Sequence, residues 1–402
     1  MKDPVMPLEG VRVLEMGTLI AGPFCTRLLA DYGACVIKVE PPGTGDPMRQ
    51  WGVGVREDRS LWWTVQSRNK KCVTLDLRKP KGQEIARALA AKCDVLVENF
   101  RPGTMEKWGL SYEELKKVNP GLIMVRISGF GQYGPYRDKA GFGSVAEAMG
   151  GLRYVTGYPD LPPPRIGISI GDALASMFGV IGALNALYYR DAAGGGVGQC
   201  VDVALYEAVF ALMESALPDY DKTGYVRERT GTILPKIAPS NTYPTRDGKW
   251  IVMGANADGV FRRLTSCMGR PELADDERFY SHLARGENQA LLDDIIAGWT
   301  RQHDIQELIR ILDEAGVPAG PIYSIADIAK DPHYHAREMI REVHDRMWET
   351  VKMPGIVPKF SLTPGTIKWS GPGLGEHNEE IYCQLLGMEQ EEVERLREEG
   401  VI

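Results

Sequence analysis

Apolar runs alternate with segments of helical periodicity through the first 130 residues. The runs predict strands at 11–16, 35–40, 73–77, 94–98 and 122–128. Helices are predicted from Ala21 onward, over 80–92 and over 111–119. Pro23 suits a first helical turn, because its ring fixes φ and its missing N–H would be unpaired there. Strands that alternate with helices predict a parallel sheet covered on both faces, and therefore an α/β fold.

A long apolar segment runs from Asp172 to Tyr189. Because apolar residues cover almost every side of it, the segment predicts a buried helix. Small residues recur along it and would let another backbone approach closely; they are Ala175, Ser176, Gly179, Gly182, Ala183 and Ala186. Three glycines at 194–196 end the helix, and residues 198–217 are expected to form a strand followed by a helix.

The character of the chain changes after residue 225. A hairpin is predicted with its turn at Asp247 and Gly248. Helices are expected at about 257–268, 288–300 and 303–315. This pattern predicts a smaller α+β domain at 226–329. The large domain then comprises 1–200 and 330–402, with 201–225 as a linker, and its C-terminal tail is expected to be largely helical.

Composition narrows the classes of function. The 402 residues are 44% apolar, enough for a substantial core, and the net charge of −7 argues against general binding to nucleic acid or to a membrane surface. No apolar run approaches the roughly 20 residues of a membrane span, and the N-terminus lacks a signal-peptide pattern, so a cytoplasmic protein is expected. The seven scattered cysteines predict neither disulfides nor a zinc site.

Histidine is confined to the C-terminal part of the chain. All six histidines lie at or beyond His282, so motifs in the first 281 residues must work without imidazole. His333 and His335 are close enough in sequence to suggest metal ligands. No neighbouring cysteine or carboxylate pattern completes a ligand set, and no metal is expected.

Two features of the predicted sheet domain suggest a phosphorylated ligand. Residues 129–134, GFGQYG, match the dinucleotide fingerprint, but a loop rather than a helix follows, which disfavours NAD or FAD. A basic cluster falls near strand ends, where ligands of open α/β sheets bind, although such residues are more often plain surface charges. The cluster comprises Lys38, Arg49, Arg68, Lys70, Lys71, Arg78, Lys79, Arg101 and Lys107.

Two polar positions have both a structural and a functional interpretation. Residues 98–104, ENFRPGT, follow an apolar strand and offer an amide, a guanidinium and flexible backbone, yet Asn and Pro-Gly are ordinary turn residues. Asp172 stands where the predicted buried helix begins. It is either a helix cap or a carboxylate whose ionised form the helix N-terminus stabilises, with Gly171 leaving room for a substrate.

Over essentially its full length the chain resembles the class III coenzyme A transferases of the CaiB/BaiF type, which include formyl-CoA transferase and carnitine CoA-transferase. The ordered motifs are LIAGPFCTRLLADYGACVIKVEPPGTGDPMR, VTLDLRKPKG, VLVENFRPGTMEKWGLSYEEL, ISGFGQYGPY, IGDALASMFGVIGAL, GQCVDVALYEA, AGVPAGPIYSIADIAKDPH and LGEHNEEIYCQLLG. The resemblance implies a large Rossmann-like domain that binds CoA, a smaller domain, and a homodimer of interlocked chains.

The family's nucleophilic aspartate matches Asp172. The resemblance implies that this carboxylate attacks a donor thioester, giving a mixed anhydride and then an aspartyl-CoA thioester. A free carboxylic acid takes the CoA through a second anhydride. Such chemistry needs donors for developing oxyanions but no acid or base, which fits the missing N-terminal histidines. No cofactor is implied, because the coenzyme A thioester is itself a substrate.

The resemblance also places the substrate contacts. For CoA they are Ile20, Ala21, Leu75, Arg78, Asn99, Phe100, Arg101, Lys107, Trp108 and Lys139. Arg101 and Lys107 are expected to face the nucleotide phosphates. Residues expected near the acyl group are Phe142, Lys236 and Ser240. The stretch 229–241 lacks the glycine-rich run of formyl-CoA transferase, so the chain looks closer to members that use succinyl-CoA or another dicarboxylyl-CoA.

Two other functions stay open on the sequence. The related α-methylacyl-CoA racemases carry a proton-transferring histidine in the segment that matches residues 139–142, where this chain has Phe142. An epimerase would therefore lack one of its two proton-transfer groups. The other alternative is a non-catalytic protein that binds acyl-CoA. The donor and acceptor acids are not fixed by the sequence.

Overall fold

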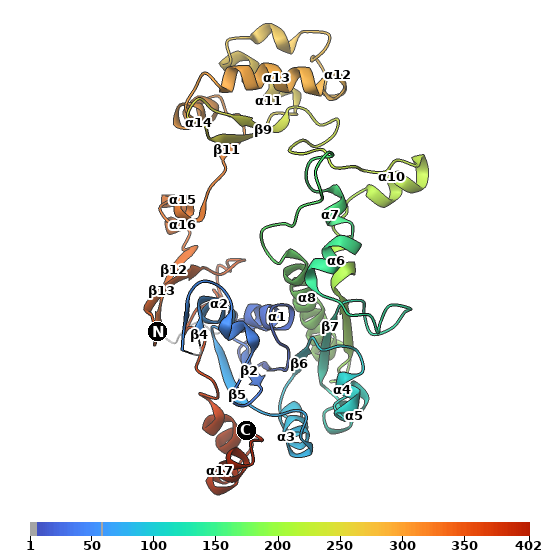
Figure 1. Ribbon diagram of the computed structural model, residues 1–402, viewed down its shortest axis with the longest axis vertical. Helices are drawn as coiled ribbons and strands as arrows, with labels where there is room; N and C mark the ends of the chain where they lie inside the picture. Colours follow the sequence, from blue (N-terminus) through green and yellow to red (C-terminus); the bar gives the residue numbers. More distant parts are fainter. Residues whose placement is uncertain (1–5, 58) are drawn as a thin grey trace. The chain divides into compact units, whose positions relative to one another are not determined.

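A computed structural model describes residues 6–57 and 59–402 (Figure 1). The chain divides into two compact units. The first comprises residues up to 152, 165–217 and 333–402, and the second comprises 153–164 and 218–332. The predicted linker at 201–225 differs from this division, because all but the first residue of β8 (Cys200–Ala204) falls within it. This strand is hydrogen-bonded into the sheet of the first unit beside β7 (Ile123–Ser128).

The first unit is built on six parallel strands in the order β5-β2-β1-β6-β7-β8. Besides β7 and β8, they are β1 (Arg12–Glu15), β2 (Cys35–Glu40), β5 (Lys70–Thr74) and β6 (Val95–Glu98). The predicted α/β fold with a parallel sheet is confirmed. The strand order proceeds outward from β1 in both directions, which is the Rossmann arrangement, and its reversal lies between β1 and β6.

Side chains that alternate along the strands form two cores, one on each face of the sheet. One core contains Leu14, Ile37, Val73, Leu96 and Met124. It is covered by α3 (Pro80–Ala90), α5 (Tyr112–Val118) and α17 (Gln390–Glu398). The other core contains Val13, Val36, Val95, Val125 and Ile127. It is covered by α1 (Ala21–Ala30), α8 (Ile170–Ala192) and α9 (Leu205–Phe210).

The small residues of α8 face the sheet and, as predicted, allow other backbone to approach closely. Ser176 donates its hydroxyl to the carbonyl of Ala21 at 2.7 Å, which joins α8 to the start of α1. A Cβ at Gly179 would lie only 3.1 Å from the Sγ of Cys25 and 3.4 Å from Ile127. Glycine there allows the helix to approach both α1 and β7 closely.

The expectation that α8 is buried on every side is wrong. Six large apolar side chains of this helix are exposed: Met177, Phe178, Ile181, Leu184, Tyr188 and Tyr189. In the part of the chain that is described, α8 is also the one helix whose length and composition would allow it to cross a membrane. The expectation that no apolar run approaches the length of a membrane span is therefore wrong. Its small-residue face packs on the sheet, as in a core helix of a globular protein.

The second unit has a three-stranded antiparallel sheet in the order β11-β10-β9. The predicted hairpin is present as β9 (Ser240–Pro244) and β10 (Trp250–Gly254), and β11 (Ala319–Pro321) pairs with β10. The predicted helices correspond to α11 (Asp258–Cys267), α13 (Gln289–Thr300) and α14 (Ile305–Glu314). Their apolar faces form the core of this unit around Tyr243 and Ile251.

Short elements complete the chain. They are β3 (Val55–Arg56), β4 (Arg59–Ser60), β12 (Ile340–Asp345), β13 (Glu349–Pro354), α2 (Leu61–Gln66), α4 (Thr104–Lys107), α6 (Gly143–Met149), α7 (Leu152–Val155), α10 (Ala216–Thr223), α12 (His282–Glu287), α15 (Ile325–Ile328), α16 (Pro332–Ala336), the 3-10 turns η1 (Pro47–Gln50) and η2 (Pro271–Ala274), and the π-helical turn η3 (Glu380–Leu385). The tail is held to β5 by Asn378, whose Oδ1 accepts the N–H of Thr74 at 2.9 Å.

Candidate active site

A pocket of about 690 Å³ opens at the carboxyl ends of the central strands. The lining of the pocket comes from three strand ends. These are residues 18–21 after β1, residues 99–102 after β6, and Ser128 and Gly129 at the end of β7. This is where the strand order reverses. The loops after β1 and β6 leave in opposite directions there and open a crevice, which is where open α/β sheets bind their ligands.

Asp172 borders this pocket from the first turn of α8. The helix begins at Ile170 with Ser169 as its N-cap, and Asp172 is the third helical residue, so the capping interpretation is wrong. The carboxylate lies against the backbone of Gly143 at the start of α6. A Cβ at position 143 would come within 2.1 Å of Oδ2 of Asp172, so only glycine leaves room for this side chain.

The surroundings of Asp172 make its charge costly. Burial and then the charge of Glu147 raise the pKa of Asp172 to about 6, against lowering contributions from its own backbone N–H and from Arg165. Glu147 lies on α6 and is only 1% exposed. At neutral pH the Asp172 carboxylate is therefore ionised but poorly hydrated, and these are the two properties of a reactive oxygen nucleophile.

The pocket brings together most of the residues predicted to bind substrate. They are Ile20, Ala21, Asn99, Phe100, Arg101, Lys139 and Phe142, together with Asp172. Arg101 and Lys139 are exposed and supply positive charge. The Lys139 ammonium lies 3.6 Å from the centroid of the Tyr136 ring. The pocket therefore contains the carboxylate, two cations and the aromatic side chains of Trp51, Phe100 and Phe142.

Four predicted CoA contacts lie outside the pocket lining. Leu75 is buried in the core below α3, and Arg78 points to solvent with its Nε 2.8 Å from Asp76. Lys107 is exposed at the end of α4. Trp108 packs edge-on against Phe100, with ring centroids 5.1 Å apart, and so touches a residue of the pocket wall. Their contacts with CoA stay predictions.

Two predicted acyl-group residues belong to the second unit. Lys236 is exposed and takes a left-handed conformation with φ of 62°, and its backbone N–H donates to Oε1 of Gln289 at 3.2 Å. Ser240 opens β9 and pairs with Gly254. Their roles also stay predictions.

The basic cluster is not a surface patch. Four of its members are at most 1% exposed: Lys38, Arg49, Arg68 and Lys70. Each of them faces a buried carboxylate at 2.6 to 2.9 Å, so none is available to a phosphate. Of the nine residues in the cluster, only Arg101 lines the pocket.

Sequence reasoning missed several pocket residues. Thr18, Trp51 and Ser128 line the pocket, but no functional role was predicted for any of them. Gly129 and Gly141 approach so closely that a Cβ on Gly129 would lie 2.6 Å from the Cα of Gly141. The two glycines were visible in the sequence, but only the fold shows that they meet.

Comparisons with known proteins agree with this site. The model of CoA-transferase family III matches residues 8–378. The succinyl-CoA–D-citramalate CoA-transferase of Chloroflexus aurantiacus is 57% identical over 399 residues, covering 99% of each chain. The beta subunit of succinyl-CoA–L-malate CoA-transferase from the same bacterium is 42% identical over 400 residues, covering 99% of this chain and 98% of the relative. The crystal structure of a CaiB/BaiF family protein from Brucella suis is 36% identical, with a TM-score of 0.84, covering 94% of this chain and 99% of that one.

Proposed function

The chain belongs to CoA-transferase family III and is an enzyme of that type. We propose that Asp172 is the carboxylate through which this enzyme exchanges coenzyme A. One observation carries the proposal. Asp172 lines the pocket at the strand switch point, lies against Gly143, and has a pKa of about 6, so that it is ionised at neutral pH. A transferase of this type needs an anionic oxygen nucleophile in such a position.

The reaction proceeds through four exchanges at carbonyl carbon. An Asp172 oxygen attacks the donor thioester, the C–S bond breaks, and CoA leaves as a thiolate. The thiolate attacks Cγ of Asp172, which releases the donor acid as a carboxylate and leaves an aspartyl-CoA thioester. The acceptor carboxylate attacks Cγ and again expels the thiolate. Attack of the thiolate on the acceptor carbonyl then gives the new acyl-CoA and restores the Asp172 carboxylate.

No step of this sequence moves a proton, because every nucleophile and leaving group is an anion. Among the described residues that line the pocket there is no histidine, and by the resemblance Phe142 occupies the position of the racemases' proton-transferring histidine. Lys139, which lines the same pocket, offsets part of the negative charge that gathers during the exchange. Racemization at an α-carbon needs proton-transfer groups on both sides of that carbon, so the transferase fits this pocket better.

We propose succinyl-CoA as donor and a hydroxylated dicarboxylic acid, such as citramalate or malate, as acceptor. The support is the two relatives at 57% and 42% identity, which are named for these acids and for succinyl-CoA. The cytoplasm, where acyl-CoA is available, is the proposed location.

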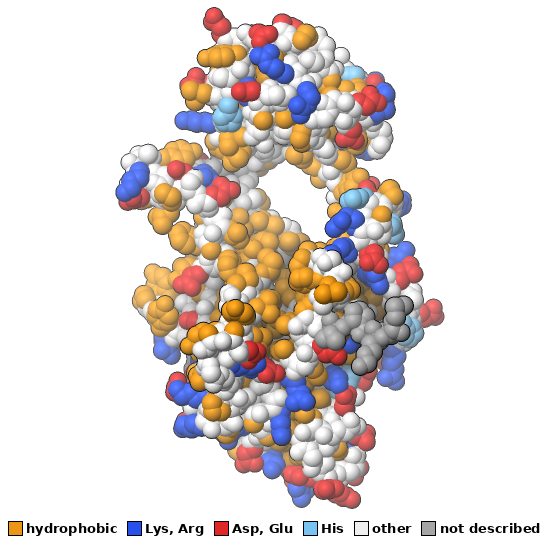
Figure 2. Space-filling model, turned by 180° about the vertical axis from the view of Figure 1, so that it is seen from behind, with side chains coloured by type: hydrophobic (Ala, Val, Ile, Leu, Met, Phe, Trp, Pro, Cys, Tyr) orange, Lys and Arg blue, Asp and Glu red, His pale blue; other side chains and the backbone are white. Residues whose placement is uncertain are grey.

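We also propose that the enzyme is a homodimer. Figure 2 shows hydrophobic side chains gathered on one face of the molecule. A groove of about 1380 Å³ in the first unit has an apolar lining that includes Phe24, Leu28, Ile181, Leu184 and Phe360. Exposed apolar patches of this extent are uncommon on monomers and are typical of interfaces. A second copy of the chain is the proposed occupant.

A panel of acids tests the function. The purified enzyme is incubated with succinyl-CoA and one acid at a time: D-citramalate, L-malate, glutarate or acetate. Mass spectrometry then looks for the new thioester. We expect citramalyl-CoA or malyl-CoA to form fastest and acetyl-CoA slowest. Formation of no new thioester, together with exchange of α-hydrogen for deuterium in a 2-methylacyl-CoA, would favour the racemase instead.

A further inference from the structure

The loop that joins β1 to α1 forms one wall of the active-site pocket through Thr18, Leu19 and Ile20. Leu19 has a φ of 63°, in the left-handed region. For a residue with a side chain this conformation costs on the order of 1 kcal/mol, and it persists only where the surroundings enforce it. The shape of this wall therefore depends on whatever holds Leu19.

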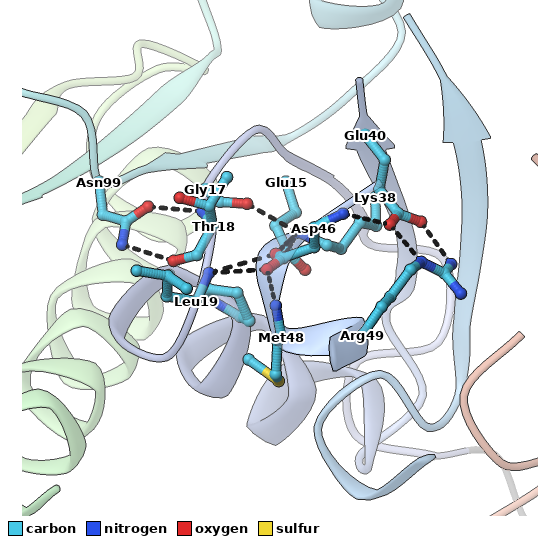
Figure 3. A network of polar contacts seen from close by, with 12 residues as sticks. Glu15, Gly17, Thr18, Leu19, Lys38, Glu40, Asp46, Met48, Arg49 and Asn99 are labelled. Carbon is cyan, nitrogen blue, oxygen red and sulfur yellow. Dashed lines mark hydrogen bonds and ion pairs between the residues drawn. The ribbon is translucent and has the colours of Figure 1, made fainter. Parts of the chain in front are cut away.

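Three side chains hold the backbone of the loop (Figure 3). Asn99 accepts the N–H of Thr18 at 2.8 Å and donates to the carbonyl of Thr18 at 2.9 Å. Asp46 accepts the N–H of Leu19 on both of its oxygens, at 3.1 and 3.2 Å. Lys38 donates to the carbonyl of Gly17 at 2.7 Å. Three consecutive residues of the loop are thus fixed by side chains far away in the sequence.

Lys38 and Asp46 are almost fully buried, at 0% and 1% exposure. Lys38 lies 2.9 Å from Glu15 and 2.9 Å from Asp46. The N–H of Asp46 also donates to Oε2 of Glu40 at 2.9 Å, which connects the loop to the end of β2. Buried ion pairs are a weak source of stability, because desolvation offsets their attraction, so a network of this size calls for another explanation.

We propose that Lys38 and Asp46 are positioning residues for the transfer reaction. They hold Leu19 in its left-handed conformation and thereby keep the peptide groups of residues 18–20 in place at the pocket wall. Without Asp46, Leu19 would move to an ordinary conformation and turn the peptide groups on either side of it. The inference rests on the proposed function, because it takes the pocket beside Asp172 to be the site of transfer.

The matched test compares two buried lysines. Lys70, from the neighbouring strand β5, is also 0% exposed and lies 2.8 Å from Glu15, but its other partner is the carbonyl of Pro23 within α1. Lys38→Met and Lys70→Met each remove one buried charge next to Glu15. We expect Lys38→Met to lower kcat by about 100-fold, the scale of a displacement of roughly 1 Å at an active site. Lys70→Met should keep kcat within about threefold.

A rescue experiment separates positioning from loss of folding. Asp46→Ala removes the acceptor of the Leu19 N–H, and kcat should fall as in Lys38→Met. Glycine adopts positive φ without penalty, so adding Leu19→Gly should recover kcat at least about tenfold relative to Asp46→Ala alone. Leu19→Gly by itself gives the baseline, because the Leu19 side chain also lines the pocket.

The outcomes are distinct. The inference is overturned if Asp46→Ala keeps the wild-type kcat, if Lys70→Met is as damaging as Lys38→Met, or if Leu19→Gly gives no recovery. If the lysine variants do not fold, the comparison of Asp46→Ala with its double variant still decides. Failure of the proposed function looks different: the wild-type protein would then transfer no CoA, or would transfer it without Asp172.

Discussion

At the scale of single residues, the central fact is the cost of the charge on Asp172. Burial and the nearby carboxylate of Glu147 both favour its protonated form, and its pKa is raised to about 6. A carboxylate that is ionised only above this pH retains basicity and carries little hydration, which favours attack on a thioester. The same features make the residue a measurable titrating group.

Activity should therefore fall on the acid side with a midpoint near pH 6. The nucleophile is the ionised form, so kcat/KM decreases as pH drops through the pKa of Asp172, which is about 6. Glu147→Gln removes a neighbouring negative charge and should shift this midpoint to lower pH. The check is kcat/KM against pH for both proteins. An unchanged midpoint in Glu147→Gln would contradict this electrostatic account.

Asp172→Asn should stabilise the folded protein at neutral pH. The folded pKa is raised from 3.8 to about 6, so ionisation opposes folding increasingly between those pH values and fully above them. Asparagine avoids this cost. The free energy of unfolding should rise by on the order of 2 kcal/mol at pH 7.5 and change little at pH 4. Urea titrations at both pH values measure it, and a loss of stability at pH 7.5 would count against the account.

The residues found from the sequence are those with a motif around them. Asp172 and seven of the predicted contacts share one pocket. Lys38 and Asp46 were not recognised as a unit, because charge alone does not tell a buried lysine from an exposed one. The pairing of β1 with β2 brings Glu15 beside Lys38, and the loop after β2 adds Asp46; only this arrangement identifies Lys38 as buried.

At the scale of elements, strands and helices with a strong period were predicted well, and β5 shows where the pattern fails. Its apolar run suggested 73–77, whereas the strand is Lys70–Thr74. Lys70 and Lys71 belong to the strand because Glu15 and Glu380 neutralise them, and such partners are distant in sequence. For α8, composition predicted the helix but not which face is exposed. The face packed on the sheet and the exposed face are both apolar, so hydrophobicity does not distinguish them.

The closeness of α6 and α8 gives a test at this scale. A Cβ on Gly143 would lie 2.1 Å from the Asp172 carboxylate, and one on Gly171 would lie 2.9 Å from the carbonyl of Gly143. Gly143→Ala should reduce kcat at least about 100-fold by displacing the nucleophile. Gly298→Ala is the control: it lies in α13 with open space around it and should gain up to about 1 kcal/mol in unfolding free energy. Full activity in Gly143→Ala would refute this placement of Asp172.

At the scale of the whole molecule, the sequence predicted two domains but not their borders. Residues 201–217 belong to the first unit because β8 extends its sheet, and residues 153–164 belong to the second. A strand at a sheet edge carries no sequence signal that distinguishes it from a strand in a linker. The apolar groove was also unforeseen, because it is formed by segments as distant as Phe24, Leu184 and Phe360.

The proposed dimer predicts different effects for two equally exposed leucines. Leu184 on α8 and Leu291 on α13 are each 40% exposed, but only Leu184 lines the apolar groove. Leu184→Glu would place a charge in the interface and should shift the protein toward monomer, whereas Leu291→Glu should leave the dimer intact. Sedimentation velocity measures both. A wild-type protein that sediments as a monomer would remove the basis for this proposal.

The most direct test of the whole account is the capture of the intermediate on Asp172. The enzyme is mixed with succinyl-CoA without an acceptor acid, quenched in acid and digested, and the peptide that contains Asp172 is weighed by mass spectrometry. The account predicts an aspartyl-CoA thioester or a succinyl anhydride on Asp172, absent from Asp172→Asn, which should still bind succinyl-CoA. An adduct on another residue, or CoA transfer at the wild-type rate by Asp172→Asn, would contradict it.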